Sequence, residues 1–186
     1  MSEYEKLLEI YKKSAILESI SEVLEWDHEV MMPEGALPIR ARQSSTLAAL
    51  GHDILTCDEI RGLLVALEKG NFNSDQAANI REIKRASERA KNVPNELVQE
   101  LEDTRIKGVE AWKEARKKND YTLFSSHLGK VFVLSRKVAE YIDPNTHPYE
   151  VLLEEYEQDI SIEEIRNHLN KIKEHLVPLI AKIKDR

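Results

Sequence analysis

The chain has 186 residues and a formal net charge of −7, with 41% hydrophobic and 33% charged residues. This length suits one domain or a large piece of a bigger protein, and the negative charge argues against nucleic-acid binding. No apolar run approaches the ~20 residues that cross a bilayer, and the start Met1-Ser2-Glu3 does not resemble a signal peptide. The single cysteine, Cys57, fits a reducing compartment. We therefore expect a cytoplasmic protein that binds neither membrane nor nucleic acid.

The first half of the chain is predicted to form four helices. A stripe of apolar residues at helical spacing predicts a first helix of about six turns. The stripe comprises Tyr4, Leu7, Leu8, Tyr11, Leu17, Ile20, Val23 and Leu24. Pro38 suits the first turn of a second helix, which carries Leu47, Leu50 and Ile54. Thr56 is the expected cap of a third helix that stops at Gly70. Asn73, with Gln76 three residues later, predicts a capping box for the fourth.

The second half is predicted to form four more helices. Pro94 begins the fifth, whose expected inward side chains are Leu97, Leu101, Ala111, Trp112 and Ala115. Asp120 is the expected cap of the sixth, with Phe124, Leu128, Val131, Phe132 and Val138 inward. A short seventh follows Pro148 and carries Tyr149, Leu152, Leu153 and Tyr156.

The last predicted helix begins at a capping box formed by Ser161 and Glu164. Its apolar stripe comprises Ile165, Leu169, Ile172, Leu176, Ile180 and Ile183. Pro178 falls inside this helix and predicts a kink or a break there. No period-two pattern predicts a strand. The expected fold is therefore all-α, a helical array of about seven or eight helices in a single helical domain over residues 1–186.

The six histidines do not have the spacing of a zinc peptidase site. Such a site places two histidines four residues apart on one helix, with a glutamate between them as the general base. His28-Glu29 begins this pattern, but Met32 stands at the closing position. His168 and His175 are seven residues apart, about 10 Å along a helix, which is too far for one ion. Glu25 and His28 form one Glu-x-x-His motif, whereas a di-iron site needs two.

The basic stretches and the connection after the first helix have structural interpretations. Residues 81–91 and 113–118 are rich in Lys and Arg, but Glu82, Glu88 and Glu114 are interleaved, as on solvated helix faces. Residues 26–35 (WDHEVMMPEG) break the first helical pattern, with more apolar side chains than an ordinary solvated turn. The simplest interpretation buries Trp26 in the core and leaves Asp27 as a cap or in a salt bridge.

Several short blocks, in this order along the chain, resemble the N-terminal region of the carboxypeptidase Taq-type enzymes. The blocks are Trp26-Asp27 with Met32-Pro33, Arg40-Ala41-x-Gln43, Val93-Pro94-x-Glu96-Leu97, Ala111-Trp112-x-x-Ala115-Arg116 and His147-Pro148-Tyr149-Glu150-x-Leu152-Leu153-x-Glu155-Tyr156-Glu157. The resemblance extends over essentially all 186 residues. One departure is Gln158-Asp159, which stands where the family often has Pro-Gly.

The resemblance implies a cytosolic, mostly helical and cleft-shaped zinc metallocarboxypeptidase, usually homodimeric, that removes residues from peptide C-termini. In that family the H-E-x-x-H motif, the third metal ligand and the substrate-binding motifs lie downstream of the region that resembles this chain. No catalytic, cofactor-binding or metal-ligating residue is therefore carried over to this sequence, and zinc is implied only in the full-length enzyme. Trp26, Met32 and Pro33 are expected to pack rather than to take part in chemistry.

We therefore expect residues 1–186 to be the cleft-wall or lid portion of such an enzyme, inactive alone because the H-E-x-x-H half is absent. The expected partners are a separate chain that carries the zinc-binding half and a second copy in a homodimer, with peptide substrates only in the completed enzyme. The alternative is a stand-alone helical module, derived from this family, that binds peptides or proteins.

Overall fold

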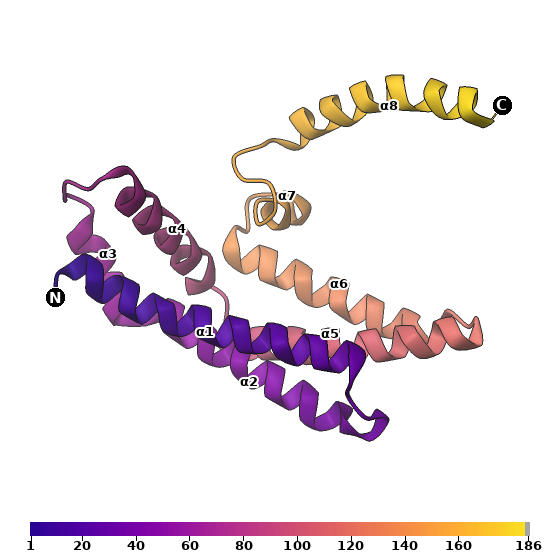
Figure 1. Ribbon diagram of the computed structural model, residues 1–186, viewed down its shortest axis with the longest axis horizontal. Coiled ribbons are helices and arrows are strands. Elements are labelled where there is room, and N and C mark those ends of the chain that lie inside the picture. The colour runs from indigo at the N-terminus through magenta and orange to yellow at the C-terminus, as the bar shows by residue number, and fades with distance from the viewer. Residues whose placement is uncertain (185–186) are drawn as a thin grey trace. The chain divides into compact units, whose positions relative to one another are not determined.

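The computed structural model describes residues 1–184, except for the side chain of Glu34, and these residues form helices joined by short connections (Figure 1). The helices are α1 (Glu3–Val30), the 3-10 turn η1 (Glu34–Ala36), α2 (Leu37–Thr56), α3 (Asp58–Leu67), α4 (Ser74–Lys91), α5 (Asn95–Lys118), α6 (Thr122–Ile142), α7 (Pro148–Leu153) and α8 (Ile162–Lys184). No strand occurs in this part of the chain, so the all-α class is confirmed. None of these helices combines the length and apolar composition that a bilayer-spanning segment requires.

The chain divides into two compact units, residues 1–142 and residues 143–186. The sequence predicts a single helical domain over residues 1–186. The division into two compact units does not test that prediction. The first unit contains α1 to α6, and the second contains α7 and α8.

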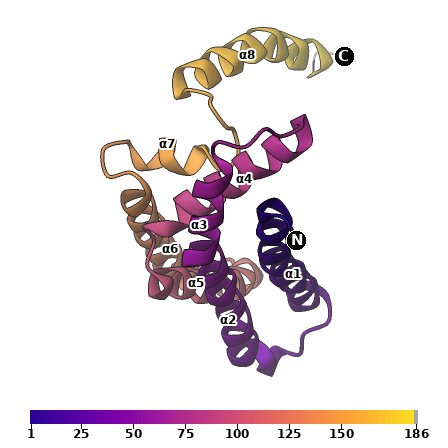
Figure 2. The ribbon, with the colours of Figure 1, turned by 90° about the vertical axis from the view of Figure 1, so that its left-hand side faces the viewer.

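In the first unit, α2 lies between α1 and α5, and α6 packs along α5 (Figures 1 and 2). Two clusters of buried side chains hold this arrangement together. One joins α1, α3 and α4 and is built from Leu7, Ile60, Leu64, Leu67 and Ile83. The other joins α5 and α6 through Val93, Leu97 and Leu134. Ile83 is 2% exposed, so the charged helix α4 is anchored by one of its few large aliphatic side chains.

Most of the predicted helix starts are confirmed. Asn73 and Gln76 form the expected capping box of α4, and Pro94 directly precedes α5. The Asp120 carboxylate accepts hydrogen bonds from the backbone and hydroxyl of Thr122 at the start of α6. The prediction for Thr56 is wrong, because this residue ends α2 and its hydroxyl donates to the carbonyl of His52. Cys57 caps α3 with its backbone alone, and that helix ends at Leu67 rather than at Gly70.

The inward-facing residues of α5 and α6 are predicted correctly in part. Leu97 and Ala115 are buried, as expected. Trp112 and Phe132 were expected inside but are exposed. The pattern shows which face of a helix is apolar, but it does not show whether another element of the same chain covers that face.

In the second unit, α7 is short and is held by the buried side chain of Val151. Tyr149 and Tyr156 are exposed, and Tyr156, which was predicted to lie in this helix, lies beyond its end. Asp159 has a φ of 56°, a left-handed conformation that glycine adopts most readily. This is the position where the resembling family often has glycine, and a non-glycine residue adopts this conformation at some cost in strain.

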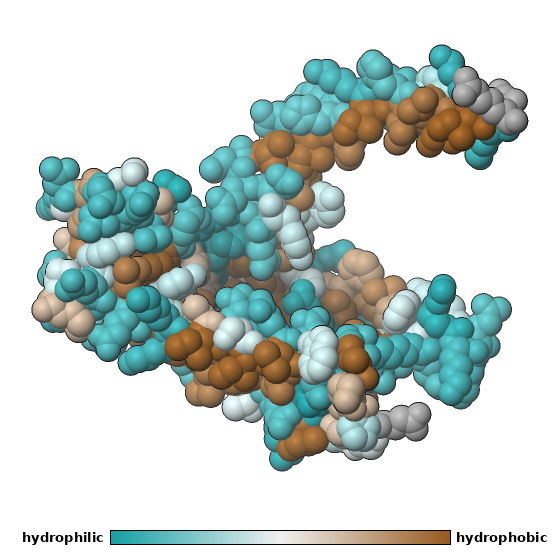
Figure 3. All heavy atoms as spheres, viewed as in Figure 1, coloured by the Kyte–Doolittle hydropathy of each residue, from teal (hydrophilic) through white to brown (hydrophobic). Residues whose placement is uncertain are grey.

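The helix α8 begins at the predicted capping box, in which Ser161 and Glu164 exchange hydrogen bonds. It continues through Pro178 without the break that was one of the two expected outcomes, and Figure 1 draws it as a curved helix. No residue of α8 is buried. Its apolar stripe is therefore exposed, and it appears as a continuous brown band in Figure 3.

The first core cluster generates a test of the fold. Replacing Ile60, which is 0% exposed, by alanine removes buried methyl groups and leaves a cavity, so we expect a loss of about 2–5 kcal/mol in unfolding free energy. Val65→Ala in the same helix is the matched control, because Val65 is 68% exposed and should cost no more than about 0.5 kcal/mol. Urea unfolding followed by circular dichroism measures both. Equal losses for the two variants would show that α3 does not pack through Ile60.

Candidate functional site

The stretch that the sequence singles out, residues 26–35, is helical over its first half. The expected break of the first helix does fall within this stretch, because α1 ends at Val30 and the backbone N–H groups of Met31 and Met32 donate to the carbonyl of Asp27. The change of direction occurs at Met32 and Pro33, before the 3-10 turn. The helical part of the stretch brings the motif residues onto faces of α1 that meet other helices.

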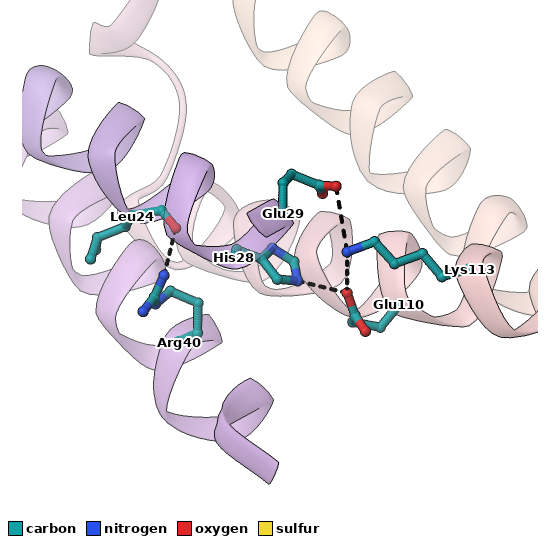
Figure 4. Close-up of polar contacts among 6 residues, drawn as sticks. All are labelled: Leu24, His28, Glu29, Arg40, Glu110 and Lys113. Atoms are coloured by element: carbon teal, nitrogen blue, oxygen red, sulfur yellow. Dashed lines mark hydrogen bonds and ion pairs between the residues drawn. The ribbon is translucent and has the colours of Figure 1, made fainter. Parts of the chain in front are cut away.

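His28 is buried at the junction of α1 and α5. It is 8% exposed, and its Nε2 atom lies 2.8 Å from Oε1 of Glu110 on α5 (Figure 4). A carboxylate only accepts hydrogen bonds, so the proton of this contact belongs to the imidazole nitrogen. Lys113 donates to the same Glu110 oxygen at 2.8 Å, and its ammonium group lies 3.5 Å from Glu29 of α1. Four side chains from two helices thus form one polar network.

Asp27, the neighbour of His28, points to a different helix. Its carboxylate pairs with the guanidinium group of Arg40 on α2. The same guanidinium group donates to the backbone carbonyl of Leu24 at 2.5 Å and to the side-chain oxygen of Gln43 at 3.1 Å. Figure 4 shows Arg40 reaching across to α1. The expectation of a salt bridge for Asp27 is confirmed, and Arg40 holds the ends of α1 and α2 together across the turn.

The charges of the network shift two pKa values in the sense that favours an ionised pair. Partial burial acts to raise the pKa of Glu110, but hydrogen bonds from Lys113 and His28 outweigh it and leave the pKa below its usual range. Burial acts to lower the pKa of Lys113, but its hydrogen bond to Glu110 raises it overall. Glu110 and Lys113 therefore form a stabilised ion pair, and the lowered pKa of Glu110 does not suit a general acid.

Glu102 of α5 behaves in the opposite way. Burial raises its pKa, Arg105 opposes that shift and the nearby carboxylate of Glu25 adds to it. Glu25 belongs to the Glu-x-x-His motif of α1. The two residues of this motif therefore interact with α5 in different ways, Glu25 by repulsion of the Glu102 carboxylate and His28 by its pair with Glu110. A second Glu-x-x-His motif does not accompany it in the sequence.

Three of the other histidines make separate contacts on different helices or turns. His52 lies 3.1 Å from the carbonyl of Ala90, His147 accepts from the backbone N–H of Tyr149, and His175 lies 2.8 Å from the carbonyl of Lys171. Within residues 1–184, no group of three or more His, Cys, Asp or Glu side chains is arranged to hold a metal ion. The zinc ion of a metallopeptidase therefore does not fit the residues described here.

The packing roles expected for Trp26, Met32 and Pro33 are mostly wrong. Trp26 is 59% exposed, Pro33 is exposed and Met32 is half-buried. Trp26 shares an exposed apolar stripe with other residues of α1. The stripe comprises Ile16, Ile20, Val23, Trp26 and Val30.

Comparison with known proteins identifies the family. The sequence profile described as Carboxypeptidase Taq (M32) metallopeptidase matches residues 6–186. The chain belongs to this family. Thermostable carboxypeptidase 1 of Thermus thermophilus is 31% identical over 193 aligned residues, which cover 97% of this chain and 38% of that protein. The protein of the same description from Pyrococcus furiosus is 29% identical, over 96% of this chain and 36% of its own length.

The fold agrees with this membership. A solved structure of Pyrococcus furiosus carboxypeptidase, described as Apo-Mg, superposes on this chain with a TM-score of 0.80 at 28% identity. The superposition covers 98% of this chain and 37% of that structure. The chain thus spans little more than a third of the length of the M32 carboxypeptidases that it matches.

Sequence reasoning singled out Asp27 and Arg40 in separate blocks and His28 as part of an incomplete metal motif, but it missed the partners on α5. Glu110 is 82 residues from His28 in sequence, and a single Glu on a charged helix gives no local signal of such a contact. The nearest signal is its position beside the Ala111-Trp112 block of the M32 resemblance. The contact between His28 and Glu110 thus joins two residues that each stand beside a block of the resemblance.

Loss of Arg40 tests the α1–α2 part of the junction. Arg40→Met leaves the part-buried Asp27 carboxylate without its guanidinium partner and removes the additional hydrogen bond to the Leu24 carbonyl, so we expect about 1–3 kcal/mol less unfolding free energy. Arg42→Met, an exposed position on the same helix, is the control and should change the value by less than about 0.5 kcal/mol. Denaturant unfolding measures both. If the two variants lose the same unfolding free energy, the packing of α1 against α2 does not depend on Arg40.

Glu110 tests the α1–α5 part through pH. A carboxyl whose folded pKa is depressed stabilises the fold above its unfolded pKa, and that stability is lost as pH falls through the folded pKa. Glu110→Gln should therefore lower stability near neutral pH and have a smaller loss on acidification than the native chain. Its control is Glu114→Gln, at an exposed carboxylate paired with Lys118, where solvent screening makes the effect smaller. Unfolding free energies from about pH 7 to about pH 3 give the comparison, and parallel curves for native and Glu110→Gln proteins would contradict it.

Proposed function

We propose that residues 1–186 form the N-terminal part, a cleft wall or lid, of a zinc-dependent metallocarboxypeptidase that removes C-terminal residues from peptides. The observation that carries the proposal is the pattern of coverage. The match extends over almost the whole of this chain but over only 36–38% of each carboxypeptidase relative. Function in this family is therefore expected to need the larger part that these residues do not match.

The metal chemistry is assigned to that larger part. The sequence contains no H-E-x-x-H motif, since Met32 closes the one candidate. His28, the histidine of that candidate, is already hydrogen-bonded to Glu110 inside a helix junction. We infer that the zinc-binding half comes from further sequence, or from a separate chain, and that peptide substrates bind only in the completed enzyme. A homodimer and a cytoplasmic location belong to the same proposal.

The contribution of these residues is mechanical support. The junction of α1, α2 and α5 fixes three long helices by ion pairs and hydrogen bonds to named atoms. Helices fixed in this way can form a wall with a defined position, which a binding cleft needs in order to orient a peptide. The exposed apolar stripes of α1 and α8 support the same conclusion, since exposed patches of this kind mark surfaces that meet another protein part.

The purified chain itself gives the test. With added zinc it should release no C-terminal residue from N-blocked dipeptides, hold no stoichiometric zinc, and bind a hydrophobic dye through its exposed helix faces. The full-length Thermus thermophilus protein is the positive control for the assay. Activity with one zinc per chain would contradict the proposal. A monodisperse, cooperatively melting monomer that binds no dye would favour a stand-alone peptide- or protein-binding module instead.

A further inference from the structure

The apolar side chains of α8 follow a coiled-coil spacing. Leu169 and Leu176 are seven residues apart, and intervals of four and three residues alternate along the helix. This alternation is the a/d pattern of a helix that packs along one other helix. The residues at these positions, called the α8 seam below, are Ile165, Leu169, Ile172, Leu176, Leu179 and Ile183.

Within its own unit, residues 143–184, no described residue buries the α8 seam. Its members are exposed, except for the half-buried Ile165. In Figure 1 the helix is curved, and in Figure 3 its apolar side chains lie on the concave side. Long helices curve with the convex side toward solvent and the concave side around what they pack against. Pro178 sits off the seam, on the opposite side of the helix, so its missing hydrogen bond leaves the seam continuous.

The charges beside the seam indicate what kind of helix fits it. The positions that flank the seam on its two sides, e and g of the heptad, hold no carboxylate. They are Arg166, Lys173 and Ile180 on one side and His168, His175 and Lys182 on the other. The acidic residues of α8, Glu163, Glu164 and Glu174, fall on the other positions. A helix that packs here would place its own flanking side chains against positive or neutral groups.

We propose that the α8 seam is the docking face for one helix of the remaining part of the metallocarboxypeptidase, an apolar heptad helix flanked by carboxylates. That this helix belongs to the remaining part of the enzyme rests on the proposed function. That it is apolar and flanked by carboxylates is argued from the residues of the α8 seam and its flanks. The larger part of each relative lies outside the match and can supply it. A second copy of α8 fits poorly, because parallel and antiparallel pairing both bring flanks of the same sign together.

Two synthetic peptides test the preference directly. Both are three-heptad helices with Leu at a and d, one with Glu and the other with Lys at every e and g position. Fluorescence anisotropy measures their binding to the 186-residue chain. We expect the Glu peptide to bind at least about ten-fold more tightly than the Lys peptide, and added salt to narrow the difference. Equal affinities, or no binding of either peptide, would overturn the proposal.

Matched variants of α8 locate the binding face. Leu176→Glu places a charge in the seam and should abolish binding of the Glu peptide. Val177→Glu makes the same change at the next residue, which is similarly exposed (56% against 47%) but off the seam, and should leave binding intact. Equal effects of the two variants would overturn the proposal. Circular dichroism shows whether each variant keeps its helix.

Charge reversal tests the flanks without touching the seam. Lys173→Glu, at a flanking position, should weaken binding of the Glu peptide and strengthen that of the Lys peptide. Lys171→Glu, on the same helix but away from the flank, should change neither. Light scattering on the chain alone tests whether a second copy occupies the seam. A dimer that dissociates in the Leu176→Glu variant would show that it does, and would overturn the proposal. None of these measurements involves zinc or peptide hydrolysis. The docking proposal can therefore fail while the proposed function stands, and the proposed function can fail while the docking proposal stands.

Discussion

Two adjacent residues near the end of α1 bind to two different helices, and the arrangement of the first unit depends on them. Asp27 pairs with Arg40 of α2, and His28 pairs with Glu110 of α5. In a helix, neighbouring side chains point about 100° apart, so one turn of α1 can be held from two sides. Two further hydrogen bonds support the pairs, because the Leu24 carbonyl accepts from Arg40 and Lys113 donates to Glu110. Removing one member would leave a partly buried polar group unpaired, which costs more than the pair contributes.

The helices and most of their starts could be predicted from the sequence because their signals are local. The capping box of Asn73 and Gln76, the prolines at positions 38 and 94, and the period of the apolar residues all act within one or two turns. The connection between α1 and α2 follows local signals too. Pro33 and Gly35 indicate a turn. A proline disfavours helical backbone only at the residue directly before it, so the helix can continue as far as Val30.

The contacts of the candidate site could be predicted only in part. The proximity of Asp27 and Arg40 follows from a short connection between two helices, so a salt bridge was a reasonable expectation. The partner of His28 is a tertiary contact over 82 residues, and neither charge nor spacing identifies Glu110 among the many acidic residues of the chain. Family resemblance located both blocks of this junction but did not show that they meet. That connection required the structure.

The exposed residues that were expected to be buried share a physical cause. Trp26, Trp112 and the α8 seam are apolar positions at helical spacing, so their sequence pattern is that of core positions, although they are exposed apart from the half-buried Ile165. The spacing of apolar residues shows that a helix face is suited to burial, but it does not show which segment covers that face. When a chain spans little more than a third of its relatives' length, some apolar faces are expected to belong to contacts with the remaining part. The basic flanks of α8 make this more specific than a general need for burial. They distinguish an acidic partner from a second copy or a nonspecific apolar contact, because charge at the edge of a seam sets partner choice more than affinity.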